Sequence, residues 1–264
     1  MKVTKNGKFF FVNSFEGSFF NKLKRALVNF LMSFLIDSFW EKVQNNNWEK
    51  ETYNIFDNFL DKNNSYIDIG AWIGPTVLYG CQLSKHCYAI EPDFVAYQSL
   101  KSNIELNKNL INKITLYNGA ISNITGKMAI SARFGLGDSM SSVLERNSDD
   151  ILFVGCLKFN DFINRFKIND CNFVKIDAEG AEVLILLSMS EFIKQNKPTI
   201  HLSLHPFLFK NLREDSKKIL NTLKLYKNVY DNRGNILNYR EIEEKLLNKK
   251  LFDIVLTDLN WSKK

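Results

Sequence analysis

Side chains that can bind ligands or carry protons recur in this sequence at the ends of short apolar runs. In chain order they are Asp68 with Gly70, Glu91, the three residues Asn118, Gly119 and Ala120, Asp177 with Glu179, and His205. Each apolar run has the length and composition of a β-strand. Because the carboxyl ends of parallel strands meet at one edge of a sheet, near the switch in strand order, we expect these side chains to form one site.

The loop after the first of these runs reads D-I-G-A-W-I-G. Gly70 permits a tight turn, and Gly74 lets the following helix approach closely. A dinucleotide-binding fingerprint reads G-x-G-x-x-G, but here Trp72 and Pro75 occupy its second and third glycine positions. Asp68 would also bring a negative charge close to a pyrophosphate. S-Adenosylmethionine carries an ammonium and a sulfonium group and no phosphate, so the loop favours this cofactor over NAD.

Glu91 lies seventeen residues after Gly74, at the end of the second predicted strand and directly before Pro92. An acidic residue at this place can accept hydrogen bonds from both hydroxyls of a ribose. The alternative for Glu91 alone is an ordinary strand-end carboxylate. Its spacing from the glycine loop favours the cofactor-binding interpretation, in which Pro92 also contacts the cofactor.

From residue 65 onward, β-rich runs alternate with helical periodicity. We expect strands at 65–70, 86–92, 113–122, 173–180, 199–206 and 252–258, and helices at 94–106 and from Pro75 onward. Repeated β–α units predict a doubly wound α/β fold, with a mostly parallel sheet of about seven strands and helices on both faces. One domain is expected over residues 61–264.

Residues 1–60 are expected to form an N-terminal extension with a short strand at 8–15 and an amphipathic helix at 19–42. Charged residues interrupt this helix, whereas a membrane-spanning helix needs about 20 mostly apolar residues. Three roles stay open: packing against the main domain, a lid or dimer surface, and a helix lying in a membrane interface. We expect no stable membrane insertion.

The chain contains, in order, the segments SYIDIGAWIGPTVLYG, YAIEPD, LKSNIELN, NGAIS and FVKIDAEGAE, between residues 65 and 182. These segments resemble the motifs of the FkbM family of S-adenosylmethionine-dependent methyltransferases. The resemblance implies a class I methyltransferase (Rossmann-like) fold and O-methylation, frequently of sugars or polyketide-like natural products. It also implies that Gly70, Ala71, Trp72 and Glu91 line the cofactor and that residues 118–120 lie near its adenine.

A further candidate segment, RFGLGDSMSSV, lies in a long connection at residues 133–143. Ser139 and Ser141 of this segment could supply hydroxyl and backbone donors to the methionine carboxylate of the cofactor or to the substrate. A solvated turn is the alternative.

Asp177, Glu179 and His205 are the candidate catalytic residues. Asp177 could orient an acceptor hydroxyl, accept its proton or bind a metal, and we expect it to contact the cofactor as well. Glu179 could take the same catalytic roles or cap the helix expected to begin at Gly180. His205 is a candidate general base, because an imidazole titrates near neutral pH, and a structural histidine is the alternative. A divalent cation held by His205 and Asp177 is a further hypothesis. The ligand set is incomplete in the sequence, so we assign no metal ligand.

Composition narrows the choice of partners and location. The chain has 264 residues and a net charge of +6. Its lysines are spread along the whole length, which is typical of a solvated surface, and we expect no nucleic-acid partner. The four cysteines show no CxxC spacing and we find no signal peptide, so we expect free thiols in the cytoplasm.

We therefore expect an S-adenosylmethionine-dependent O-methyltransferase that acts on a sugar, a nucleotide sugar or another glycan precursor. The substrate class rests on the resemblance alone, and a homo-oligomer stays open. An NAD(P)-dependent oxidoreductase is the runner-up, disfavoured by Trp72 and Asp68. A non-catalytic binding subunit with a methyltransferase fold is the third interpretation, and the intact glycine loop and strand-end carboxylates argue against it.

Overall fold

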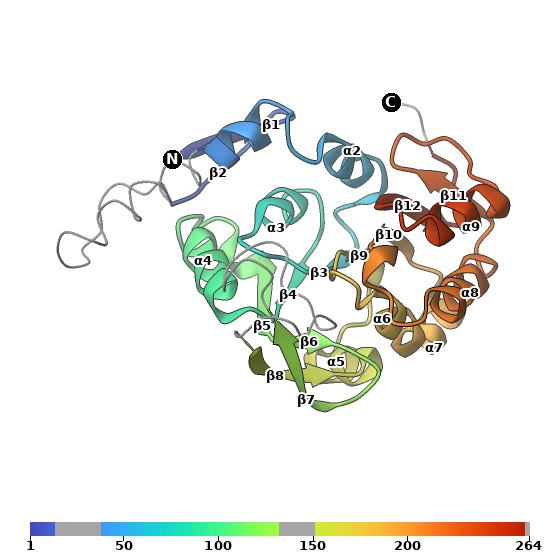
Figure 1. Cartoon of the computed structure of the whole chain (residues 1–264). Coiled ribbons are helices and arrows are strands. Elements are labelled where there is room, and N and C mark those ends of the chain that lie inside the picture. Colours follow the sequence, from blue (N-terminus) through green and yellow to red (C-terminus); the bar gives the residue numbers. More distant parts are fainter. Residues whose placement is uncertain (14–37, 132–150, 262–264) are drawn as a thin grey trace.

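One large twisted sheet lies at the centre of the molecule (Figure 1). The structure is a computed structural model that describes residues 1–13, 38–131 and 151–261. In spatial order the seven strands are β11 (Asn228–Asp231), β12 (Phe252–Thr257), β10 (Thr199–Leu204), β9 (Cys171–Ile176), β3 (Ser65–Ile69), β4 (Cys87–Glu91) and β5 (Ile114–Asn118). Strand β12 runs antiparallel to both of its neighbours, and the other pairs are parallel. The prediction of a doubly wound, mostly parallel sheet of about seven strands is confirmed.

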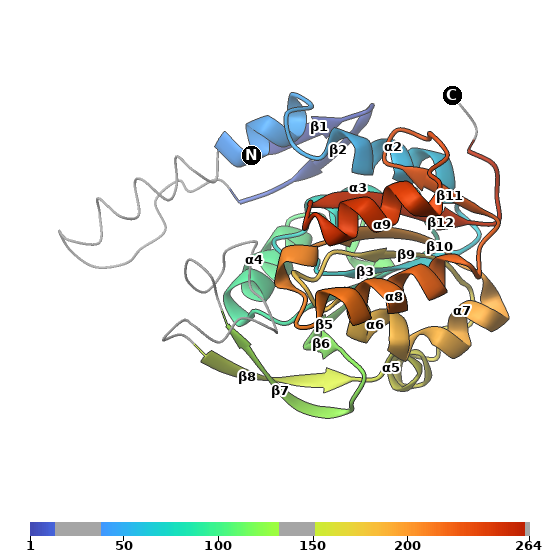
Figure 2. The same cartoon turned by 45° about the vertical axis from the view of Figure 1, so that its right-hand side comes forward.

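Helices cover both faces of this sheet, each over its own apolar core. The first set is α2 (Lys50–Phe59), α3 (Pro75–Gly80) and α4 (Phe94–Glu105), and the second is α5 (Phe159–Phe166), α6 (Glu182–Ser188), α7 (Ser190–Asn196), α8 (Leu212–Leu223) and α9 (Tyr239–Leu247). Figure 2 shows α5, α6 and α8 on the side of the sheet opposite to α3. Because strand side chains alternate between faces, Tyr66 packs in the first core and Ile67 in the second.

The same alternation places three polar side chains in a row on the face of α2 and α3. Asp68 of β3 is paired in register with Lys175 of β9, and Lys175 with His201 of β10. Their side chains share the face of Tyr66 and Phe173, since strand positions two apart point the same way. All three residues are buried, with at most 3% of their surface exposed. A polar row therefore crosses the middle of an otherwise apolar sheet.

Two smaller sheets complete the described residues. Strands β1 (Lys2–Lys5) and β2 (Lys8–Phe11) form an antiparallel hairpin, and β6 (Ala120–Ile121), β8 (Ile151–Leu157) and β7 (Gly126–Ser131) form a three-stranded sheet. The single strand expected at 113–122 is thus wrong, because the chain leaves the large sheet at Gly119. The expected strand at 173–180 ends at Ile176, where the chain turns away from the sheet.

The N-terminal segment packs on the rest of the chain. Val3, Phe10 and Trp40 are fully buried in the core that α2 and α3 share. Residues 38–44 are helical, and the remainder of the helix expected at 19–42 lies outside the described residues. Within the described ranges, no helix combines the length and the apolar character that a bilayer crossing requires. All four cysteines are free, as expected.

Candidate active site

A cavity of about 630 Å³ lies at the carboxyl ends of β3, β4, β9 and β10. Of the residues singled out in the sequence, those that line it are Gly70, Ala71, Trp72, Glu91, Pro92, Ala120, Asp177, Glu179 and His205. They come from five separate segments of the chain. The structure therefore brings most of the strand-end side chains into one space, which is large enough for a cofactor and a small acceptor together.

The remaining candidates lie behind this lining or outside the described residues. Asp68 is fully buried beneath the cavity. The Asn118 side-chain amide donates a hydrogen bond of 2.9 Å to the backbone carbonyl of Glu91, so it supports the strand end. A Cβ at Gly119 would press on the Tyr117 ring, at 2.6 Å from its nearest carbon. Ser139 and Ser141 fall within residues 132–150, outside the described residues.

The glycine loop holds the ends of two strands close together. Gly70 has φ +85, and a Cβ at this residue would collide with the backbone carbonyl of Asp177. Gly74 has φ +98, and a Cβ there would lie 2.7 Å from the Leu100 side chain of α4. Trp72 takes a left-handed conformation, with φ 47, and its ring packs edge-on against Phe39 at 4.7 Å. Close packing on every side thus fixes the shape of this wall of the cavity.

The Glu91 carboxylate accepts two backbone hydrogen bonds at the end of β4. Trp72 N–H donates to Oε2 and Asp93 N–H donates to Oε1, each at 2.8 Å. Burial raises the pKa of Glu91 to about 7, although both N–H groups lower it. A carboxylate has about four lone-pair sites, so Glu91 can accept two further hydrogen bonds from a ligand in the cavity. This capacity matches a pair of neighbouring hydroxyls.

Lys175 lies in the buried polar row and contacts three groups. Its Nζ atom is 3.4 Å from Asp68 Oδ1, 3.6 Å from Asp177 Oδ2 and 3.3 Å from the Gly70 carbonyl oxygen. Burial lowers the pKa of Lys175, but the negative charges of Asp68 and Asp177 raise it by a larger amount. The pKa of Lys175 therefore lies well above its ordinary value. Burial raises the pKa of Asp68, and the lysine opposes this. Lys175 was not singled out in the sequence, although a lysine inside an apolar strand is a visible signal.

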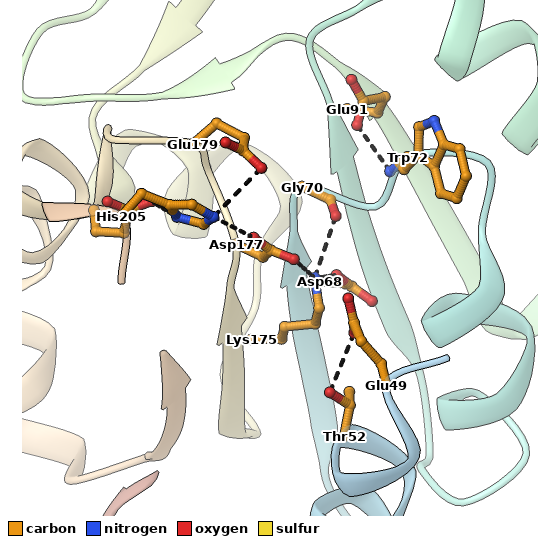
Figure 3. A network of polar contacts seen from close by, with 11 residues as sticks. Glu49, Thr52, Asp68, Gly70, Trp72, Glu91, Lys175, Asp177, Glu179 and His205 are labelled. Atoms are coloured by element: carbon orange, nitrogen blue, oxygen red, sulfur yellow. Dashed lines mark hydrogen bonds and ion pairs between the residues drawn. The ribbon is translucent and has the colours of Figure 1, made fainter. Parts of the chain in front are cut away.

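Glu49, at the start of α2, reaches into the same region from the N-terminal segment (Figure 3). Thr52 Oγ1 donates a hydrogen bond of 3.2 Å to its Oε2 atom. Burial raises the pKa of Glu49 to about 8, and the charge of Asp177 adds to the effect. Glu49 has φ 38, and with Trp48 and Thr52 it lines the cavity. These three residues were not singled out in the sequence, because they precede the motifs that carry the family resemblance.

His205 is surrounded by three carboxylates (Figure 3). Its Nδ1 atom is 3.0 Å from Glu182 Oε1, and its Nε2 atom is 3.3 Å from Glu179 Oε1 and 3.9 Å from Asp177 Oδ1. Burial lowers the pKa of His205, but hydrogen bonds to Glu179 and Glu182 and the charge of Asp177 raise it to about 11. In this arrangement the imidazole holds its proton at neutral pH.

The capping role considered for Glu179 is not filled by a side chain, because the N-cap residue of α6 is Ala181. Glu182 was not singled out in the sequence. Its Oε1 atom accepts a hydrogen bond of 2.9 Å from the Gly180 N–H. Helix α6 begins at Glu182 rather than at Gly180. Glu179 has φ 45, a left-handed conformation that directs its carboxylate to His205 instead.

His201 is a further buried group on the cavity wall. It is 2% exposed, and neither ring nitrogen has a hydrogen-bond partner within the part of the chain that the structure describes. Burial lowers its pKa, so the imidazole is neutral at pH 7. The outer part of the cavity is lined by Asp231, Arg233, Asn235, Lys245 and Asp253.

Comparison with known proteins assigns most of the chain to one family. A family model described as Methyltransferase FkbM domain matches residues 68–235, which is more than half of the chain. A search of curated proteins gives no significant match.

Several solved structures have a similar fold. The FkbM methyltransferase of Methylobacillus flagellatus KT is 20% identical with a TM-score of 0.44, and the match covers 63% of this chain and 38% of that one. A Streptococcus mutans protein described as a candidate methyltransferase, in complex with SAH, is 14% identical with a TM-score of 0.45, covering 80% and 97%. Aeropyrum pernix fibrillarin with bound S-adenosyl-L-methionine is 9% identical with a TM-score of 0.42, covering 75% and 67%. The matched part spans less than half of the Methylobacillus protein.

Proposed function

This chain belongs to the FkbM methyltransferase family, and on that premise we propose that it transfers the methyl group of S-adenosylmethionine to a hydroxyl of a sugar or glycan precursor. One observation carries the proposal. A single cavity joins the Glu91 carboxylate, which can bind a ribose, to the group of Asp177, Glu179 and His205, which can handle a hydroxyl.

The chemistry of the cavity fits S-adenosylmethionine. The Glu91 carboxylate can still accept hydrogen bonds from the ribose hydroxyls. Beside it, Gly70 has no side chain, which lets the loop lie close to the end of β9. Glu49 and Asp177 place two carboxyl groups beside Lys175 at this end of the cavity. Burial keeps Glu49 largely protonated near neutral pH in the free protein, and a cation bound beside it would favour its ionised form. Negative charge stabilises the ammonium and sulfonium groups of this cofactor. When bound, the cofactor supplies an electrophilic methyl group.

The chain's own residues position the acceptor and take its proton. Asp177 and Glu179 are the two carboxylates beside His205 that could accept this proton. We assign the role to Asp177, because its side chain is 26% exposed, against 12% for Glu179. His205 holds its proton near neutral pH and anchors Glu179. With the cofactor bound, Asp177 would accept the proton of the acceptor hydroxyl as its oxygen receives the methyl group in line, and the demethylated cofactor would leave as a neutral thioether.

The outer part of the cavity supports a polyhydroxylated acceptor. Asp231, Asn235 and Asp253 offer hydrogen-bond acceptors, and Arg233 and Lys245 offer donors. A sugar ring needs such a mixed lining, because each hydroxyl both donates and accepts. The two cations would also suit the phosphate of a nucleotide-linked sugar.

Calorimetric titrations with S-adenosylmethionine and with NADH separate the proposed transferase from an oxidoreductase. We expect saturable binding of S-adenosylmethionine and none of NADH. Glu91→Ala should weaken S-adenosylmethionine binding about tenfold or more, because two charge-assisted hydrogen bonds to the ribose are lost. Binding of NADH, or unchanged affinity in the variant, would contradict the proposal.

The acceptor is tested by supplying sugars and nucleotide sugars and measuring release of S-adenosylhomocysteine, with NMR to locate the new methyl ether. Asp177→Asn should lower turnover by about 10²-fold or more, since a proton acceptor is lost. Its affinity for S-adenosylmethionine, measured in parallel, should change far less. An equal loss of turnover and affinity would assign Asp177 to cofactor binding alone.

A further inference from the structure

We propose that Asp177, Glu179 and His205 form a binding site for one divalent cation, which takes Mn²⁺ in preference to Mg²⁺. One carboxylate oxygen from each acid and one ring nitrogen of the histidine lie within 4.8 Å of one another. The two acids follow β9 and the histidine follows β10, so adjacent parallel strands bring them together. These residues also line the cavity, which gives the cation and an acceptor oxygen a shared space.

The distances inside this group match coordination of a single ion. Ligands about 2.1 Å from an octahedral cation lie about 3.0 Å apart at adjacent positions and about 4.2 Å apart at opposite ones. Here Nε2 of His205 lies 3.3 Å from Glu179 Oε1 and 3.9 Å from Asp177 Oδ1. Small side-chain shifts therefore bring all three atoms into one coordination sphere, and its other positions stay free for water or an acceptor.

The carboxylate behind the imidazole is a separate indication. Glu182 Oε1 lies 3.0 Å from Nδ1 of His205, and Glu182 is fully buried. A metal-ligating histidine characteristically donates its other ring N–H to such a carboxylate, which fixes the ring and directs the free nitrogen at the metal. The Gly180 N–H holds Glu182 in this position. Nε2 is thereby aimed at Asp177 and Glu179.

The charge balance favours a cation in this group, and an unpaired histidine favours a further ligand or water elsewhere in the same cavity. Three carboxylates surround His205, whereas Lys175, the buried cation of the polar row, is shared between Asp68 and the Oδ2 atom of Asp177. His201 lines the same cavity with both ring nitrogens lacking a partner among the described residues, although it is 98% buried. A buried polar group without a partner points to a missing ligand or water.

The donor set indicates the class of ion. Carboxylate oxygens suit Mg²⁺ and Mn²⁺, and an imidazole nitrogen moves the preference from Mg²⁺ towards the transition metals. A cation here would take the place of the proton on His205. Its catalytic purpose rests on the proposed methyl transfer, in which positive charge beside the acceptor oxygen favours loss of the hydroxyl proton. Binding of the cation itself does not depend on that function.

The test uses the full chain after treatment with a chelator and dialysis. Calorimetry with MnCl₂ should show saturable binding of one ion, with weaker binding of MgCl₂. Pulsed electron paramagnetic resonance should detect ¹⁴N coupling from a coordinated imidazole, replaced by ¹⁵N coupling in protein with labelled histidine. This measurement needs no variant, so it decides the proposal even if substitutions in the cluster impair folding.

Two variants and a matched control locate the site. Glu182→Gln should lower Mn²⁺ affinity by about 10- to 100-fold, the usual effect of losing the partner of a ligating histidine. Glu179→Gln removes a ligand and should lower it at least as much. Asp253→Asn removes one carboxylate from the same cavity outside the cluster and should leave the affinity close to that of the wild type.

Absence of saturable Mn²⁺ binding, or binding without imidazole coupling, would overturn the proposal. An equal loss in Asp253→Asn and Glu179→Gln would do the same, because it would show attraction by overall negative charge. Titration of the metal-free chain with S-adenosylmethionine tests the proposed function separately, so either proposal can fail alone.

Discussion

Replacing Gly70 by alanine tests how tightly the cofactor loop is packed. Gly70 has φ +85, and an added Cβ would overlap the Asp177 carbonyl oxygen and lie 2.9 Å from its carbonyl carbon. Carbon atoms in ordinary contact are about 3.5–4.0 Å apart. The ends of β3 and β9 must therefore separate, or the loop must move, before an alanine fits.

Gly7→Ala is the matched control for this substitution. Gly7 has φ +76, close to the value at Gly70, but an added Cβ would have no heavy atom within 4 Å. Both variants therefore carry the cost of a left-handed alanine, about 1–2 kcal/mol. Only Gly70→Ala adds overpacking, which costs about 1–3 kcal/mol or more. The difference between the variants isolates the collision with Asp177.

Thermal unfolding and calorimetry provide the two measurements. One kcal/mol shifts the melting temperature of a chain near this size by about 2–4 °C. Gly7→Ala should thus melt about 2–8 °C below the wild type, and Gly70→Ala about 4–20 °C below it, always lower than its control. Gly70→Ala should also lose affinity for S-adenosylmethionine, because Ala71 and Trp72, which line the cavity beside Glu91, move with the loop. Equal melting temperatures and unchanged affinity in the two variants would refute this account of the loop.

Two further predictions concern buried charges. Burial raises the pKa of Glu91 to about 7, so the free protein gains a proton there as pH falls through that value. Below that pH, affinity for S-adenosylmethionine should fall by up to about tenfold for each unit of pH, because protonation of Glu91 competes with binding. In calorimetry, Glu91→Gln should lose this pH dependence. Lys175→Met leaves Asp68 without its ion pair, and denaturant unfolding should show a loss of about 3–5 kcal/mol. A Lys175→Met, Asp68→Asn double variant should recover part of it, and an unchanged midpoint in Lys175→Met would contradict the role of the ion pair.

Local patterns allowed much of the large sheet to be predicted. The runs that became β3, β4, β10 and β12 are apolar and bounded by glycine, proline or polar residues, so they are visible in the sequence alone. The strand expected at 113–122 was wrong at Gly119, because the chain passes from one sheet to another there. Strand β11, with four residues, and the sheet formed by β6, β7 and β8 were not predicted. Their pairing depends on partners distant in the chain.

Some residues of the candidate site were predicted from local patterns, and others reach the site only through the tertiary structure. Residues at strand ends, such as Glu91 and Asp177, were found because a parallel sheet gathers its carboxyl ends at one edge. Glu49 was not found, because it lies in the N-terminal segment and reaches the cavity only when α2 packs against the sheet. Lys175 and Glu182 were also missed, since their partners are set by strand register and by the first turn of α6.

The sequence by itself determined the order of the strands β3, β4, β9, β10 and β12, the glycine loop and the acidic residues that follow β9 or end β4. These features depend on residues close together in the chain, through side-chain periodicity and backbone conformation. The tertiary structure alone decided the protonation of His205, the ion pair of Lys175 with Asp68 and the place of Glu49. Each depends on burial and on charges from distant segments, whose effects fall off over a few ångströms and exist only once the chain has folded.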